Sequence, residues 1–137
     1  MKTSHIEHIG IAVSNLQESI SFYENVLGLK CYSTEDVPDQ KVRTAFFRIG
    51  ETKIELLEST DPDGTVAKFI EKRGEGIHHI AYAVSDIGSS LREAEAKGIK
   101  LIDTLPRTGA EGLQIAFLHP RSTFGVLTEL CEDPSKK

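Results

Sequence analysis

The chain of 137 residues has no tryptophan, only two cysteines and no long apolar run. Two cysteines are too few for a disulfide framework, so we expect Cys31 and Cys131 to be buried, reduced thiols of a cytoplasmic protein. No apolar stretch approaches the roughly 20 residues that span a bilayer. The first residues show no pattern of a secretory signal. These absences predict a soluble intracellular protein that needs neither a disulfide scaffold nor a membrane.

Positive charge is also scarce, because 16 lysine and arginine residues face 21 acidic residues and give a net charge of −5. This balance argues against non-specific binding of nucleic acid. A content of 39% hydrophobic and 27% charged residues is ordinary for a globular protein. We therefore expect one compact domain over residues 1–137 with no nucleic-acid or membrane partner.

The chain repeats itself. The segment HIGIAVSNLQESI, which starts at His8, resembles the segment HIAYAVSDIGSSL, which starts at His79. Asn15 and Asp86 take the same place in the two segments, and each is a good helix N-cap. Apolar residues alternate before each cap and follow helical spacing after it. Each half of the chain is therefore predicted to open with a strand and a helix.

Three further strands are predicted in each half, because short runs rich in β-branched and aromatic residues lie between turn signals. They cover residues 31–37, 43–49 and 53–58 in the first half, and 100–105, 113–119 and 125–131 in the second. A short helix is predicted over about residues 64–74. The predicted fold class is α+β: two paired β-α-β-β-β modules, about residues 5–60 and 76–132, that form a curved mixed sheet.

Alternation along these strands brings four candidate metal ligands to equivalent positions. His8 and His79 lie on the first strand of each module, on the face that does not meet the helix. Glu55 and Glu129 lie at corresponding places on the last strands and point to that same face. Two imidazoles and two carboxylates suit a divalent transition metal. The sequence thus predicts a metal site inside the curved sheet.

The remaining histidines receive simpler interpretations. His78 points away from the predicted site, because its neighbour His79 points towards it. His5 lies in the N-terminal lead-in, so both are expected to be structural. His119, in the segment FLHPRS, is expected either to pack structurally or to line the mouth of a substrate site.

Six segments carry a resemblance to a known family: HIGIAVSNL, GETKIELLE, VAKFIEKRGEGIHHIAYAV, KGIKLIDTLPRTGAEG, IAFLHPRS and GVLTEL. In them the chain resembles the vicinal oxygen chelate superfamily, and most closely its methylmalonyl-CoA epimerase branch. The resemblance implies metal ligands at His8, Glu55, His79 and Glu129. It also implies a divalent ion, with Co²⁺ favoured over Zn²⁺, Ni²⁺ or Mn²⁺, an acyl-CoA substrate and a homodimer.

The activity implied by the resemblance is epimerisation of (R)- and (S)-methylmalonyl-CoA. It proceeds by abstraction and return of the α-proton through a metal-stabilised enolate. Glu129 is the candidate base for one face of the substrate and Glu55 for the other. Some relatives have glutamine in place of Glu55. Others have an acid/base carboxylate on the preceding strand, where this chain has Thr44.

Contacts to coenzyme A phosphates are expected from cationic side chains, with Arg121, Lys72 and Arg73 as candidates. Each of the three is equally well explained as a solvated surface charge.

Two alternatives of different classes stay open. The chain also resembles a lactoylglutathione lyase (glyoxalase). That enzyme has the same fold, uses the same ligand types and also moves a proton, through an enediolate. A metal-free binding protein on this fold is less favoured, because such proteins usually lack a complete set of four ligands. Activity on methylglyoxal with glutathione, and metal content after purification, distinguish these alternatives.

Overall fold

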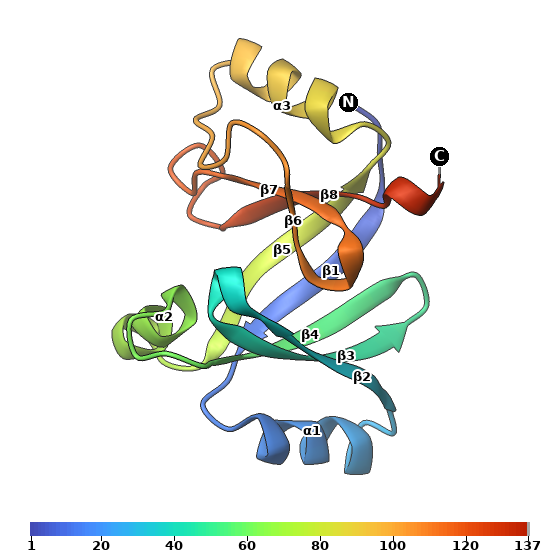
Figure 1. Cartoon of the computed structure of the whole chain (residues 1–137), viewed down its shortest axis with the longest axis vertical. Helices are drawn as coiled ribbons and strands as arrows, with labels where there is room; N and C mark the ends of the chain where they lie inside the picture. The colour runs from blue at the N-terminus through green and yellow to red at the C-terminus, as the bar shows by residue number, and fades with distance from the viewer. Residues whose placement is uncertain (137) are drawn as a thin grey trace. The chain divides into compact units, whose positions relative to one another are not determined.

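The computed structural model of the protein describes residues 1–136, and Figure 1 shows their helices and strands. In chain order these residues form β1 (Thr3–Ala12), α1 (Leu16–Asn25), β2 (Cys31–Val37), β3 (Val42–Ile49), β4 (Thr52–Ser59), α2 (Thr65–Arg73), β5 (Gly76–Val84), α3 (Ile87–Ala96), β6 (Arg107–Thr108), β7 (Gln114–Leu118) and β8 (Thr128–Glu132). Three short 3-10 turns accompany them: η1 (Pro38–Gln40), η2 (Ala110–Gly112) and η3 (Pro134–Lys136). No helix among the described residues is long and apolar enough to cross a bilayer.

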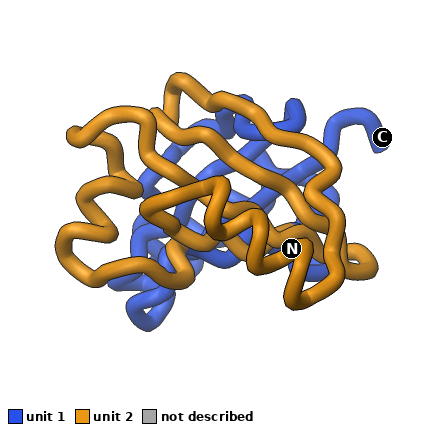
Figure 2. The backbone as a smooth tube through the Cα atoms, turned by 90° about the horizontal axis from the view of Figure 1, so that it is seen from below, with its two compact units in different colours: residues 1–7, 79–137 blue, residues 8–78 orange. Residues whose placement is uncertain are grey.

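The chain forms two compact units, which Figure 2 shows in different colours. Residues 8–78 form one, called here the His8 unit. Residues 1–7 and the chain from residue 79 onward form the other, the His79 unit. The boundaries fall inside β1 and β5, directly before His8 and His79. The predicted organisation as one domain of two tandem modules stays a prediction.

Each unit contains a mixed sheet of the same design. In the His8 unit the strand order is β2-β3-β4-β1, with β1 parallel to β4 and the other neighbours antiparallel. In the His79 unit the order is β5-β8-β7-β6, again with one parallel pair, β5 and β8. The predicted order of one strand, one helix and three strands is confirmed in the His8 unit, and in the His79 unit it holds with β6 at a different place from the predicted one.

One helix packs on one face of each sheet. In the His8 unit, α1 covers β3 and β4 (Figure 1) and buries a cluster that includes Leu16, Phe47 and Leu56. Tyr23 of α1 lies against the Phe47 ring, at 5.2 Å between centroids, and partial burial raises the pKa of its hydroxyl. In the His79 unit, α3 packs on β7 and β8 through a cluster that includes Leu91 and Leu130. The opposite face of each sheet is therefore left for other side chains.

The predicted N-caps are confirmed. The Asn15 side chain accepts a hydrogen bond from the backbone N–H of Glu18, at 3.0 Å, at the start of α1. The Asp86 side chain accepts one from Ser89 N–H, also at 3.0 Å, at the start of α3. Each cap satisfies one of the free N–H groups of a helix N-terminus.

A second carboxylate, from the last strand of each unit, also holds the helix start. Glu58 Oε2 accepts from Leu16 N–H at 3.0 Å, and Glu132 Oε1 accepts from Ile87 N–H at 2.8 Å. Glu58 and Glu132 each follow a candidate metal-ligating glutamate by three residues. An odd spacing on a strand points the two side chains to opposite faces. The same strand thus presents one carboxylate to the helix and one to the other face.

The strand predicted over residues 100–105 is wrong. Only Leu101 forms a β-bridge there, with Leu118, and β6 is the two-residue strand at Arg107–Thr108. The reason is the Asp103 side chain. Its Oδ2 accepts the backbone N–H of Phe117 at 2.8 Å, which a strand carbonyl would otherwise take. Aspartate is poorly suited to strands because its side chain competes for such backbone groups.

Candidate metal centre

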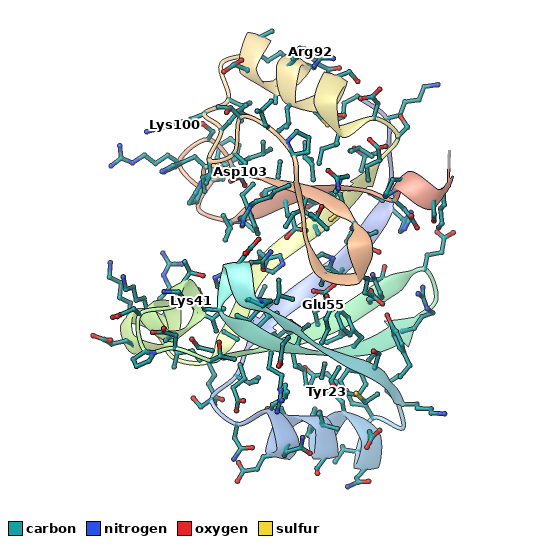
Figure 3. All side chains as sticks on the ribbon, in the orientation of Figure 1. Tyr23, Lys41, Glu55, Arg92, Lys100 and Asp103 are labelled. Carbon is teal, nitrogen blue, oxygen red and sulfur yellow. The ribbon has the colours of Figure 1, made fainter. Side chains whose placement is uncertain are left out.

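The His8 unit presents one histidine and one glutamate on the face of its sheet away from α1. Ile54 and Leu56 of β4 pack in the cluster under α1, so Glu55 between them points to the other face. Figure 3 shows Tyr23 reaching from α1 towards the sheet and Glu55 on the far side of it. In register, Glu55 lies between Gly10 of β1 and Phe46 of β3. The glycine has no side chain that would occupy the space beside Glu55.

The two side chains form a buried pair. His8 Nδ1 lies 3.2 Å from Glu55 Oε2. His8 is 3% exposed and Glu55 is 4% exposed, so both are removed from water. A buried carboxylate is stable only with a partner that satisfies its charge and hydrogen bonds. The sequence predicts that His8 and Glu55 lie on the same face, and within this unit the two side chains do lie together on that face.

The His79 unit repeats the arrangement. His79 Nε2 lies 3.2 Å from Glu129 Oε1, and the two residues are 5% and 3% exposed. In register, Glu129 lies between Ala81 of β5 and Phe117 of β7, as Glu55 lies between a small residue and Phe46. The Phe117 ring meets the His79 ring edge-on, at 5.5 Å between centroids. Each unit thus supplies one imidazole nitrogen and one carboxylate oxygen at equivalent positions.

The donor set of each pair, one imidazole nitrogen and one carboxylate oxygen, is of a kind that suits a divalent transition metal. Imidazole suits zinc, copper, iron and nickel, and carboxylate oxygen completes the mixed nitrogen and oxygen sets found at catalytic sites. All four side chains are buried, and none is a thiolate that would favour a closed structural zinc site.

Two neighbours of the pairs were missed from the sequence. Cys131 donates from Sγ to Glu129 Oε2 at 2.8 Å, and it is 1% exposed. Lys53 is 4% exposed, lies beside His8 in register and shares a face with Glu55. The available signal was spacing, because Cys131 follows one glutamate by two residues and Lys53 precedes the other by two.

Thr44 occupies β3 as predicted and carries no carboxylate. It is 1% exposed and faces Leu57 in register, on the same face as Glu55. The acidic residue nearest before β3 is Asp39, which lies exposed in the η1 turn. Asp39 lies outside the strand on which the resemblance places the carboxylate of some relatives.

The other three histidines have local partners. The His5 ring hydrogen-bonds with Ser4 Oγ at 2.8 Å. The His78 ring meets the Phe69 ring of α2 edge-on, at 5.0 Å between centroids. His119 Nδ1 accepts the backbone N–H of Arg121 at 3.1 Å.

The three candidate cations for coenzyme A are all exposed. Lys72 and Arg73 lie in the last turn of α2, and the Arg73 guanidinium lies over the Phe69 ring at 5.9 Å. Arg121 lies in the loop between β7 and β8.

Comparison with known proteins agrees with this architecture. The family model described as Glyoxalase/Bleomycin resistance protein/Dioxygenase superfamily matches residues 7–117. An uncharacterized protein of Bacillus subtilis, YqjC, is 47% identical over 129 residues, which are 94% of this chain and 92% of that protein. The mitochondrial methylmalonyl-CoA epimerase of Dictyostelium discoideum is 38% identical over 128 residues, which are 93% of this chain and 77% of that protein.

Solved structures give the same result. A Streptomyces coelicolor methylmalonyl-CoA epimerase in complex with 2-nitronate-propionyl-CoA superposes with a TM-score of 0.94. It is 36% identical, and the match covers 98% of this chain and 97% of that one. The chain therefore belongs to the glyoxalase/bleomycin resistance protein/dioxygenase superfamily. Within that superfamily it belongs to the family of methylmalonyl-CoA epimerases, so it is an epimerase and hence an isomerase.

The glyoxalase alternative has a more distant counterpart. A lactoylglutathione lyase of Arabidopsis thaliana is 32% identical over 92 residues, which are 66% of this chain and 31% of that protein.

Proposed function

We propose that this epimerase interconverts (R)- and (S)-methylmalonyl-CoA with the help of a divalent metal ion. The observation that carries the proposal is the buried pair of one histidine and one glutamate at equivalent positions of both units. It is supported by the family, since one related epimerase has been solved with methylmalonyl-CoA, at 36% identity and a TM-score of 0.94.

The metal ligands in this proposal are His8, Glu55, His79 and Glu129. Four protein donors would leave positions open for substrate on an ion that takes five or six ligands, as a catalytic site requires. When bound, the ion supplies Lewis acidity that lowers the energy of the enolate. Co²⁺ is favoured, with Zn²⁺, Ni²⁺ and Mn²⁺ as alternatives.

The protein's own part in the reaction is proton transfer. Glu129 takes the proton from the α-carbon, and the electron pair of the C–H bond spreads into the thioester and carboxylate groups. The resulting enolate is planar at that carbon. A second acid on the opposite face returns a proton and completes the inversion. Glu55 is the candidate that the sequence supplies for this second role.

Asp39 is a further candidate for the second acid. The Streptomyces coelicolor epimerase has been solved with variants of one glutamate and of one glutamine that follows it in that chain. Asp39 and Glu55 are 16 residues apart in the present chain, about the same spacing, and Asp39 is exposed in the η1 turn. We therefore propose Asp39, as an alternative to Glu55, for the acid that returns the proton.

The acyl-CoA part of the substrate carries phosphates, for which Arg121, Lys72 and Arg73 are the proposed contacts. Family resemblance further favours a homodimer, and the two cysteines favour a reducing cytoplasm.

The decisive experiment follows the α-proton of methylmalonyl-CoA by NMR in D₂O with cobalt-loaded protein. We expect loss of the proton signal without net formation of another product, and no loss after the metal is removed with a chelator. Silence with methylmalonyl-CoA, together with conversion of the methylglyoxal-glutathione hemithioacetal, would support a lactoylglutathione lyase instead.

A further inference from the structure

The two oxygens of the Glu129 carboxylate have different partners. Oε1 lies 3.2 Å from His79 Nε2, and Oε2 accepts a hydrogen bond from Cys131 Sγ at 2.8 Å. An ionised carboxylate has no proton to give, so the thiol is the donor. The carboxylate is therefore held at one oxygen by the strand that carries it and directed with the other oxygen towards the histidine.

The strand geometry makes this contact a built feature. Residues two apart on a strand point to the same face, so Cys131 lies beside Glu129 on β8. Cys131 is 1% exposed, and it packs in an apolar cluster with Leu113, Ile115 and Phe117. These three neighbours carry no polar side-chain group, whereas a carboxylate oxygen of Glu7 lies within 4.8 Å of the Cys131 sulfur.

The other unit has a different residue at this position. Leu57 follows Glu55 by two residues, as Cys131 follows Glu129, and its side chain has no hydrogen-bonding group. The repeated fold does not require a donor there, because the His8 unit forms its pair with leucine at that place. The thiol therefore distinguishes one glutamate of the repeat from the other.

We propose that Cys131 is a positioning residue, which orients the Glu129 carboxylate so that Oε1 alone is presented to the metal. This inference rests on the proposed function, because it takes Glu129 as a metal ligand. Outer hydrogen bonds of this kind are known to support metal affinity, and their loss typically costs about 10- to 100-fold.

The experiment compares Cys131→Ser, which keeps a donor, with Cys131→Ala, which removes it. Both variants lose the sulfur, so they differ only in the hydroxyl group. Metal-free protein is titrated with Co²⁺, and the dissociation constant and the visible absorption of the bound cobalt are recorded. We expect Cys131→Ala to bind Co²⁺ about 10-fold more weakly or worse, with an altered cobalt spectrum, and Cys131→Ser to stay close to the wild type in both.

Cys31→Ala is the matched control, because Cys31 packs against the cluster under α1, on the other face of the other sheet. It should leave the Co²⁺ affinity and spectrum unchanged. Thermal unfolding of each metal-free variant separates folding from ligand orientation, since a purely structural role would lower stability without changing the spectrum.

Equal Co²⁺ affinities and spectra in Cys131→Ser and Cys131→Ala would overturn this inference and leave the metal-dependent function standing. A wild-type protein that binds no Co²⁺ would overturn the metal-dependent function and this inference with it. A rescue by serine of both affinity and spectrum is the result that supports it.

Discussion

The His8 unit and the His79 unit hold the same pair of side chains in different surroundings. In the His8 unit a buried lysine, Lys53, precedes the glutamate by two residues, and the His79 unit has Leu127 there. In the His79 unit a buried thiol, Cys131, follows the glutamate by two, and the His8 unit has Leu57. The backbone repeat thus sets where the histidine and glutamate lie. The residues beside them differ in charge and in hydrogen-bonding groups between the two units.

The largest expected difference is between Glu129→Gln and Glu55→Gln. Removing the carboxylate that acts as base should slow α-proton exchange by about 10²- to 10⁴-fold. Glutamine keeps an oxygen ligand, and some relatives carry it in place of Glu55, so Glu55→Gln should slow exchange less than about tenfold. Exchange in D₂O, measured by NMR on samples with confirmed cobalt content, tests the pair. Full activity of Glu129→Gln would remove Glu129 from the mechanism.

The turns η1 and η2 give the second comparison, because each has an acidic residue at its centre, Asp39 and Glu111. We expect Asp39→Asn to slow conversion of one epimer into the other by about 10²-fold. Glu111→Gln serves as the control and should change the rate little. Asp39 is exposed, so the melting temperature should not move. Unchanged epimerisation in Asp39→Asn would leave Glu55 as the second acid.

The third comparison is between Glu132 and Glu58, the two carboxylates that accept hydrogen bonds at the starts of α3 and α1. Glu132 is 8% exposed and accepts the buried Ile87 N–H, whereas Glu58 is only half-buried. Loss of the acceptor leaves the N–H group unsatisfied, so Glu132→Ala should lower the free energy of unfolding by about 2 kcal/mol and Glu58→Ala by about 1 kcal/mol. Urea denaturation measures both. Glu132→Gln keeps an acceptor oxygen, and a loss as large as that of alanine would contradict this explanation.

The smallest expected effect is on stability, and it compares Glu93 of α3 with the residue at the same place in α1. The pKa of Glu93 on α3 lies below its ordinary value because the carboxylate accepts hydrogen bonds from the N-terminal amine and from Lys97. A carboxyl group whose pKa is lowered by folding stabilises the protein at pH values above its ordinary pKa. This stabilisation is lost as the pH falls through the pKa of the folded state. The equivalent residue on α1 is Phe22. Glu93→Gln should therefore reduce thermal stability slightly at pH 7 and progressively less as the pH falls below the ordinary glutamate pKa, whereas a loss that does not change with pH would contradict the assignment.

Much of the architecture could be predicted because it depends on local patterns. Alternation places His8 and Glu55 on one face without knowledge of the strand pairing, and the repeat gives the same result for His79 and Glu129. The caps Asn15 and Asp86 are equally local, since each acts within three residues of its own position. Such features need only the period of a strand or a helix.

The rest depends on contacts between distant segments or on side-chain direction. Glu58 reaches a helix start 42 residues earlier, and Glu132 reaches one 45 residues earlier. Asp103 replaces a strand carbonyl because its carboxylate meets Phe117 N–H, which no local pattern reveals. The Cys131 contact requires one rotamer among three. A sequence pattern predicts the face on which a side chain lies. It does not predict which neighbour the side chain contacts on that face.

The division of β1 and β5 between the units has a consequence for the origin of the chain. Residues 1–7 belong to the unit that continues from residue 79, where the Lys2 carbonyl accepts Ser85 N–H at 3.3 Å, and residues 76–78 belong to the other unit. A half-length chain would therefore lack part of a strand in each unit. Two identical half-length copies could complete each other by exchanging strand ends. A half-length ancestor that exchanged strand ends in this way would be a dimer in which each unit is built from both copies.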